Sequence, residues 1–395
     1  MANRNPTSTR FFVYACLGLG ALLFGFPLVW MLSTSLSPIE QTLSYPPRLL
    51  PLTHYATLGG ERLEVTLDGE VTAPSALVRE LTGSRAGTLK LIPEASYASS
   101  DPSLALVRLA PPGYLEVTER SASSKSVEKN PRRDVVPPGS VETEVKPRWD
   151  NYPKALGSLG GTSIEELEGF VAPTSKGSVD AEVSFWTFFG NTLLVCVLGV
   201  IGTVLSNALV AYGFARLRWR GRDAFFALTL ATLMVPAPVL MVPLFSLFQG
   251  LGWIGTLLPL WVPAFFGSAF NIFLMRQFFR TLPLELSEAA RLDGASELRI
   301  FWQVILPLSR PVLAVAALFH FLHTWNDFLG PLLYLTRKHT FTLGLALQNY
   351  QTTHGGVQWH FLMAASCVTI LPVVVLFFFA QKTFIRGIAT TGSKG

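Results

Sequence analysis

The sequence predicts an all-α polytopic membrane protein with six transmembrane helices and an inserted, β-rich extracytoplasmic domain. Half of its 395 residues are hydrophobic and 14% are charged, against about a quarter charged in a typical soluble domain. Long uncharged stretches recur along the chain, which is typical of membrane spans. One region, 37–184, is instead polar and acidic, and its strand-like patterns predict a domain outside the bilayer.

The charges are divided unevenly between this region and the rest of the chain. Residues 37–184 contain 15 Lys and Arg against 20 Asp and Glu, whereas the remaining residues contain 16 against 6. Lys and Arg accumulate in cytoplasmic loops. The acidic insert and the basic loops are therefore predicted to lie on opposite sides of the membrane.

The first segment, 1–36, is predicted to be an N-terminal tail and the first transmembrane helix. Arg4 and Arg10 precede an uncharged stretch whose part from 11 to 33 is apolar. That is enough for the roughly 20 residues of one span. The stretch exceeds the apolar run of about 7–15 residues in a secretory signal peptide, so a retained helix is favoured.

The insert, 37–184, is predicted to contain a β-rich part at about 53–120. Leu63, Val65 and Leu67 alternate with polar residues, and Asp68-Gly69 behind them is a hairpin-turn signal. Similar short strands are predicted farther along this part. Residues 121–147 are rich in Ser, Pro and charge, which predicts a linker.

The remaining segment, 185–395, is predicted to be a transmembrane core with five helices. Its spans are expected within the stretches 183–215, 224–275 (two spans joined by a turn at 250–255), 311–335 and 361–380. Arginine and lysine cluster at the N-terminus, between spans two and three, between spans four and five, and in the C-terminal tail. Both termini are therefore predicted to be cytoplasmic.

A polar, helix-prone segment within 281–311 lies between the fourth and fifth spans. Ala, Leu, Glu and Arg favour a short helix from Glu288 that ends near Gly294. A second helical run from Ser296 is predicted to continue until Pro307 and Pro311 interrupt it. The expected result is a helix-turn-helix against the inner membrane face.

Two groups of residues are candidates for a pathway or gate. Pro236 and Pro243 predict kinks in the third span. His320, His323 and Asp327 are spaced to share one helical face in the fifth. That face is consistent with a proton relay, a polar patch on a pathway or interhelical packing, whereas a metal site would need more ligands than the other spans offer.

Other chemistry is not indicated by the sequence. No GxxxxGK[ST] loop occurs, so any ATP must be bound by another subunit, and no cofactor is predicted for this chain. The three cysteines lie in apolar runs and define no disulfide framework. Nothing in the sequence indicates a nucleic-acid partner.

The segment around Glu288 resembles a known motif. Glu288-Ala289-Ala290, followed by Gly294 and by Leu306-Pro307, is similar to the EAA loop of permease subunits in ABC importers, with Val304 where the family usually has Ile. The resemblance implies that this loop docks on the ATP-binding subunit. The implied ATPase-coupling residues are Glu288, Ala289, Ala290, Asp293, Gly294, Leu306 and Pro307.

Further motifs resemble carbohydrate-type permeases, in particular the smaller permease subunit of maltose-type importers. They are Phe273 to Phe279, Ile305 to Leu308, Trp325-Asn326-Asp327-Phe328 and Gln381-Lys382. The resemblance implies the type I ABC importer permease fold and a sugar-transport role. Asn326 and Asp327 join Pro236, Pro243 and His320 as pathway candidates.

The family resemblance also implies partners. It implies a heterodimer with a second permease in the lipid of a bacterial or archaeal inner membrane, together with two ATP-binding subunits and an extracytoplasmic sugar-binding protein. An outer loop containing Gln348, Asn349, Tyr350 and Gln351 is implied to meet the binding protein and to help release sugar. The insert departs from the family pattern, which has a short outer segment there.

Two alternatives remain at this point. One is a proton-coupled secondary transporter that uses His320, His323 and Asp327. The other is a membrane enzyme that acts on an outer-face glycan, although the β-rich part shows no convincing pair of carboxylates or nucleophile. A transport subunit that is not itself an enzyme is the favoured interpretation.

Overall fold

A computed structural model provides the structure of the chain and divides it into two compact units. One unit comprises Met1–Tyr152 with Trp359–Ala364, and the other comprises Pro153–Gln358 with Ala365–Gly395. The structure describes residues 6–42, 48–58, 60–73, 75–80, 89–93, 104–119, 133–159, 183–348, 350 and 358–391.

Several helices are long and apolar enough to cross a membrane. Among the described residues, four pass this test individually: Val13–Ser35, Phe185–Ala215, Leu258–Thr281 and Trp359–Gln381. Two further pairs pass together but are bent, Arg222–Met234 with Ala237–Gly250 by 99° and Glu297–Leu308 with Arg310–Trp325 by 79°. The chain is thus mostly helical, with four to six candidate spans depending on whether each bent pair is one span.

In the first unit, the chain that follows the β-rich region returns to the C-terminal end of α1, where that region begins. Helix α1 (Pro6–Ser35) is followed by the short α2 (Ile39–Thr42). The Asn151 side chain donates hydrogen bonds to the carbonyl oxygens of Ser35, at 2.8 Å, and Ser37, at 3.1 Å. The Ser35 hydroxyl lies 2.9 Å from the Tyr152 hydroxyl. These contacts hold the two ends of the β-rich region together.

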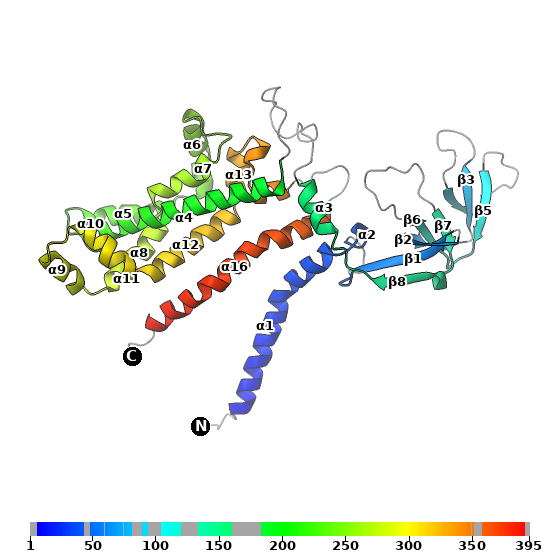
Figure 1. The fold of residues 1–395 in the computed structure, drawn as a ribbon, viewed down its shortest axis with the longest axis horizontal. Coiled ribbons are helices and arrows are strands. Elements are labelled where there is room, and N and C mark those ends of the chain that lie inside the picture. Colours follow the sequence, from blue (N-terminus) through cyan, green and yellow to red (C-terminus); the bar gives the residue numbers. More distant parts are fainter. Residues whose placement is uncertain are drawn as a thin grey trace. The chain divides into compact units, whose positions relative to one another are not determined.

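The β-rich region consists of two antiparallel sheets (Figure 1). The five-stranded sheet has the order β7-β6-β2-β1-β8, and the three-stranded sheet has the order β4-β3-β5. The strands are β1 (Leu52–Leu58), β2 (Glu61–Glu70), β3 (Ser75–Glu80), β4 (Leu89–Pro93), β5 (Leu104–Ala110), β6 (Leu115–Glu119), β7 (Arg133–Val136) and β8 (Val141–Val145). A 3-10 turn, η2 (Pro138–Ser140), joins the last two strands.

Buried aliphatic side chains hold these sheets together. Val65 and Val117 are buried in one cluster of the larger sheet, with Leu63 packed against it, whereas Leu67, expected on the same face, is exposed next to the irregularity in the pairing with β6. Val135 of β7 packs with Leu77 of β3 and Ala110 of β5, so this cluster joins the two sheets. The β-rich character expected for the insert is therefore present.

Two expectations for the insert are wrong. Asp68-Gly69 does not form a hairpin turn, since both residues lie within β2 at an irregularity in its pairing with β6, and the β1–β2 turn contains Gly60 at φ +89° instead. The predicted linker at 121–147 contains two strands, β7 and β8, while 121–132 lie outside the described residues. Both strands are short and lie at the edges of the sheet, β8 with mostly exposed side chains and β7 with only Val135 and Val136 buried, so their sequences carry a weak strand signal.

The second unit is built around the long helix α4 (Phe185–Ala215), which packs against α8 (Ala269–Thr281), α12 (Arg310–Trp325) and the 3-10 segment η5 (Val262–Phe266) (Figure 1). The other elements are α3 (Asn151–Ser158), α5 (Arg222–Ala231), η4 (Thr232–Met234), α6 (Ala237–Gly250), α7 (Leu258–Trp261), α9 (Glu285–Leu292), α10 (Glu297–Ile300), the π-helical turn η6 (Phe301–Ile305), α11 (Leu306–Leu308), α13 (Leu329–Tyr334), η7 (Lys338–Thr340), α14 (Leu343–Leu347) and α16 (Trp359–Thr391). The first residues of α3 and of α16 belong to the other unit.

Glycines on α4 allow its neighbours to approach closely. A Cβ at Gly199 would lie 2.5 Å from Nε2 of His320, and one at Gly202 would lie 2.4 Å from the Phe265 ring. Both distances are too short for real side chains. The contacts of α4 with α12 and with η5 therefore depend on the missing side chains, as is common where helices pack inside membranes.

The expected fifth span differs from its prediction in two ways. The helix from Arg310 ends at Trp325, and a separate helix, α13, follows it, so 311–335 is not one continuous helix. Pro307 does not interrupt the run from Ser296, because it lies at the start of α11, where a missing N–H is tolerated.

The third span bends sharply, because Pro236 precedes α6 and separates it from α5 and η4.

Candidate functional site

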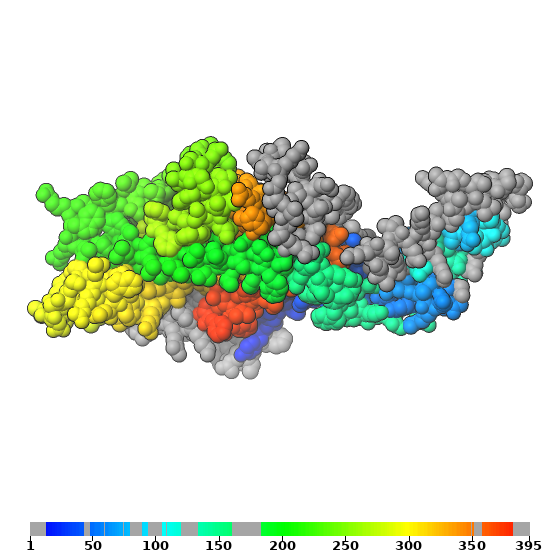
Figure 2. Space-filling view, turned by 45° about the horizontal axis from the view of Figure 1, so that its top comes forward, coloured from blue at the N-terminus to red at the C-terminus, as the bar shows by residue number. Residues whose placement is uncertain are grey.

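The segment with the EAA pattern forms two short helical limbs (Figure 1), and it lies at one end of the second unit, coloured yellow in Figure 2. The first limb is α9. Its first turn contains Glu285 and Glu288 and its last turn contains Arg291, so the charges complement the helix dipole. The second limb begins at α10, where the Ser296 side chain accepts a hydrogen bond from the Arg299 amide at 3.4 Å.

Gly294 forms the turn between the limbs. Its φ is +77°, a left-handed conformation that L side chains rarely adopt. The Ala295 amide donates to the Ala290 carbonyl at 3.0 Å, and the Gly294 amide donates to the Arg291 carbonyl at 3.0 Å. This pair of bonds is the Schellman motif, which requires the residue after the helix to be left-handed. The predicted helix end near Gly294 and its turn are confirmed.

The predicted coupling residues divide into an exposed and a packed group. Ala290 and Leu306 pack against a buried apolar cluster that includes Phe279 and Phe301. The other predicted residues are exposed: Glu288, Ala289, Asp293, Gly294 and Pro307. An exposed apolar side chain, Leu292 at the end of α9, accompanies them and is 90% exposed.

A buried arginine attaches α4 to the chain that enters α9. The Arg216 guanidinium, just after α4, donates to the carbonyl oxygen of Leu282 at 2.8 Å and to that of Pro283 at 3.4 Å. Burial lowers the pKa of Arg216, and the positive charge of Arg291 adds to this effect. These bonds to carbonyl oxygens satisfy part of a cation that would otherwise be costly to bury.

The candidate gate residues have structural contacts in this unit. His320 lies between two threonines, with Nδ1 at 3.1 Å from the Thr203 hydroxyl and Nε2 at 3.3 Å from the Thr324 hydroxyl. Asp327 does not share a helical face with His320, because α12 ends at Trp325. One oxygen of Asp327 instead accepts a hydrogen bond from the Gly330 amide at 3.1 Å, in the first turn of α13.

Asn326 and the two prolines are also placed at helix boundaries or surfaces. The Asn326 amide donates to the Leu322 carbonyl at 2.7 Å at the end of α12. Pro236 precedes α6, Pro243 lies inside it, and both side chains are exposed. Within the part of the chain that the structure describes, no group of three His, Cys, Asp or Glu side chains is placed to hold a metal ion.

The implied release loop is only partly described. Asn349 and Gln351 lie outside the described residues. Tyr350 is buried, its hydroxyl donates to the Ala155 carbonyl of α3 and it lies 3.3 Å from the Ser158 hydroxyl. Burial raises the pKa of Tyr350 to about 12. Its ring therefore anchors this loop to α3 and does not form an open surface for a sugar, whereas Gln348 is only half-buried.

Some residues with clear structural roles were not candidates in the sequence. Asn207 in α4 accepts a hydrogen bond from the Ser268 amide at 2.7 Å, and its amide group donates to the Thr203 carbonyl at 2.6 Å. Tyr212 in the same helix and Glu297 in α10 also contact each other. A polar side chain within an apolar span was the available signal for Asn207 and Tyr212, but it does not identify the partner.

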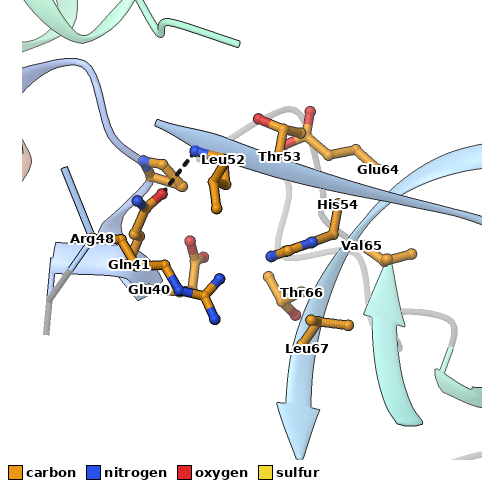
Figure 3. Close-up of a pocket in the computed structure, with 11 residues that line it drawn as sticks. Glu40, Gln41, Arg48, Leu52, Thr53, His54, Glu64, Val65, Thr66 and Leu67 are labelled. Carbon is orange, nitrogen blue, oxygen red and sulfur yellow. Dashed lines mark hydrogen bonds between the residues drawn. The ribbon is translucent and has the colours of Figure 1, made fainter. Parts of the chain in front are cut away.

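The first unit contains a small pocket of about 170 Å³ where two strands separate (Figure 3). Strands β1 and β2 pair as far as His54 opposite Val65, and both strands continue beyond that pair. Arg48, Glu40 and His54 border the pocket. Burial lowers the pKa of His54, with a smaller effect from the Arg48 charge. Of the carboxylates that line it, Glu64 forms an ion pair with Arg148.

Comparison with known proteins identifies a family for the membrane part. Residues 207–390 match the model of the family described as binding-protein-dependent transport system inner membrane component. The arabinooligosaccharides transport system permease protein AraQ of Halalkalibacterium halodurans is 39% identical over 211 residues, which are 53% of this chain and 75% of AraQ. The sn-glycerol-3-phosphate transport system permease protein UgpE of Salmonella typhi is 35% identical over 231 residues, 58% of this chain and 81% of UgpE.

A solved structure is similar over nearly the whole length of the chain. It is described as a bacterial ABC transporter involved in the import of the acidic polysaccharide alginate. The match covers 97% of this chain and 98% of that chain, with a TM-score of 0.59 and 19% sequence identity, so it shows the fold. The structural match and the family model show the type I ABC importer permease fold. The relatives are transport permeases and not enzymes, and they confirm the resemblance to the permease subunits of carbohydrate ABC importers. By its identity to these relatives and its coverage of them, the chain belongs to the family of binding-protein-dependent transport system inner membrane components.

Proposed function

We propose that this chain forms half of the translocation pathway of an ATP-driven importer for a sugar or oligosaccharide and is coupled to a separate ATPase subunit through α9. The observation that carries the coupling is the exposed end of α9, where Glu288, Ala289 and the 90% exposed Leu292 precede the Gly294 turn. A short helix with an exposed apolar side chain suits docking in a groove of a partner. The family membership supports this proposal.

The substrate class is proposed from the relatives. AraQ is named for arabinooligosaccharides and UgpE for sn-glycerol-3-phosphate, so both names refer to compounds rich in hydroxyl groups. A neutral or phosphorylated polyol is therefore the expected class, and an oligosaccharide is the first substrate to test. No particular sugar, maltose included, is favoured by the described residues.

The proposed assembly contains a second permease, two ATP-binding subunits and an extracytoplasmic binding protein. The proposed topology has six spans with both termini cytoplasmic, which counts each bent helix pair as one span. It puts Arg216, Arg276 and Arg291 on the cytoplasmic side and the β-rich insert outside. The domain boundaries proposed for this arrangement are 1–36, 37–184 and 185–395.

A proton-coupled carrier is not favoured by the contacts of its proposed residues. Both ring nitrogens of His320 face threonine hydroxyls, and Asp327 binds an amide of α13. A relay needs groups that exchange protons along a path. These side chains are instead bound to separate parts of the helix packing.

The test uses the complete transporter purified in mild detergent and reconstituted in liposomes. A Leu292→Cys variant is expected to form a cross-link with the ATPase subunit, while Ser140→Cys in the insert is the matched exposed control and should form none. Uptake of labelled arabino-oligosaccharide is expected to require ATP and to continue when an uncoupler removes the proton gradient. A cross-link from Ser140→Cys, or uptake that stops with the uncoupler while ATP is present, would contradict the proposal.

A further inference from the structure

The carboxylate of Glu297 joins three elements of the second unit. One of its oxygens accepts a hydrogen bond from the Tyr212 hydroxyl at 2.6 Å, and the other lies 2.7 Å from Nε of Arg291. Tyr212 lies in the last turn of α4, Arg291 in the last turn of α9, and Glu297 at the start of α10. The Glu297 side chain therefore connects both helical limbs, α9 and the limb that begins at α10, to α4.

The position of Tyr212 is fixed by its packing. Its side chain is 4% exposed and belongs to the same buried cluster as Ala208 and Ala211. Its ring lies 5.2 Å from the ring of Phe301, measured between centroids. Since a buried phenol needs a hydrogen-bond partner for its hydroxyl, Glu297 is held at a defined point beside α4. A displacement of Glu297 must then either move α4 or break this bond.

The ionic contact closes the turn between the two limbs. The backbone at Gly294 has open space around it, because no atom lies within 4 Å of a Cβ placed there. The bond from Arg291 to Glu297 spans this glycine and connects α9 to α10 through side chains. The Glu297 hydrogen bond raises the pKa of Arg291, so the charged form is favoured. Without this ionic contact, α9 and α10 would be connected only through the backbone of the Gly294 turn.

We propose that Tyr212, Glu297 and Arg291 form a joint that transmits movement of α9 to α4. This proposal rests on the proposed function, in which α9 contacts the ATPase. Arg216 attaches α4 to the chain that enters α9, through Leu282. The joint attaches α4 on the side where the chain leaves α9, so α9 and the end of α4 move as one body. In this role all three are positioning residues.

The joint predicts a specific loss of coupling. In Tyr212→Phe the ring is retained and one hydroxyl is removed, and in Glu297→Gln the shape is retained and the charge is removed. We expect the number of substrate molecules taken up per ATP hydrolysed to fall at least fivefold in each variant, while ATP hydrolysis continues. In the double variant, the number of substrate molecules taken up per ATP should be no lower than in the more affected single variant, because both substitutions break the same connection.

Matched controls separate this role from general stability. Tyr334→Phe also removes a phenol from a buried ring of the same unit, and Arg299→Ala removes a contact within the second limb, Nε of Arg299 to Gln303 at 3.0 Å. Both controls should keep the uptake-to-hydrolysis ratio of the parent. A purely structural role for the joint would lower the yield of assembled transporter without changing that ratio.

The measurement is made in proteoliposomes that contain the complete transporter, with arabino-oligosaccharide as the probe and a Leu292→Cys cross-link to the ATPase measured in each variant. No cross-link in the parent background would refute the proposed function. Two results would refute the joint but not the proposed function, provided that the cross-link forms. One is an unchanged ratio of uptake to ATP hydrolysis in Tyr212→Phe. The other is a ratio in the double variant that falls by the product of the two single effects. If Glu297→Gln does not assemble, Tyr212→Phe decides, because its ring packing is kept.

Discussion

The turn at Gly294 gives a sharp test of how α9 is held. Its φ of +77° is open to glycine, and no atom lies within 4 Å of a Cβ built there. A substitution is therefore opposed by backbone strain and not by a clash. An L residue in the left-handed region costs about 1–2 kcal/mol, and asparagine costs less than alanine because its side chain bonds locally. Proline cannot adopt this conformation, because its ring holds φ near about −65°.

These costs predict an order of effects. Gly294→Asn should transport nearly as well as the parent, and Gly294→Ala should shift the equilibrium away from the native turn by a factor of about 5–30. Gly294→Pro should be the most damaging, because it also removes the amide that bonds to the Arg291 carbonyl at 3.0 Å. We expect it to hydrolyse ATP without uptake while it still inserts into the membrane.

The assay is ATP hydrolysis and sugar uptake measured on the same proteoliposomes. Gly213→Ala is the matched control, since this glycine lies in α4 and a Cβ there meets no atom within 4 Å and needs no left-handed backbone. It should leave both activities unchanged. Normal uptake by Gly294→Pro, or equal damage from asparagine and proline, would show that backbone conformation at this turn does not control coupling.

Three further predictions concern packing and loop contacts, each measured on purified protein in detergent. Gly202→Ala should lower the free energy of unfolding by about 1–3 kcal/mol because of overpacking against Phe265, and Phe265→Leu in the same chain should restore part of it in a thermal melt; an unchanged melt would contradict the close approach. Asn207→Ala should lower the free energy of unfolding by about 1–3 kcal/mol, because the Ser268 amide loses its acceptor. Faster hydrogen exchange of the Ser268 amide is the measurement. Tyr350→Phe should lower the free energy of unfolding by about 1 kcal/mol, because the hydrogen bond to the Ala155 carbonyl is lost. The Tyr350 pKa is raised to about 12, so the stability from this hydroxyl is complete below pH 10 and is lost as the pH rises towards 12. An ultraviolet titration of the tyrosine can detect this ionisation.

Local features of the segment around α9 could be predicted from the sequence because they depend on neighbouring residues. The end of α9 and the turn at Gly294 follow from helix propensity and from the freedom of glycine, and both lie where they were expected. The exposure of Glu288 and Ala289 fits the motif. The role of Glu297 could not be predicted, because its partner Tyr212 lies 85 positions earlier in the chain.

The sequence by itself determined the membrane class, most of the apolar helices, the β-rich insert and the permease motif, because hydropathy and turn chemistry are local properties. The tertiary structure decided which polar side chains meet. It placed β7 and β8 at the edges of a sheet, beside β6 and β1, brought His320 to Thr203 and buried Tyr350 against α3. Each of these contacts joins residues whose separation in the chain is set by the fold, and a local pattern does not specify such pairs.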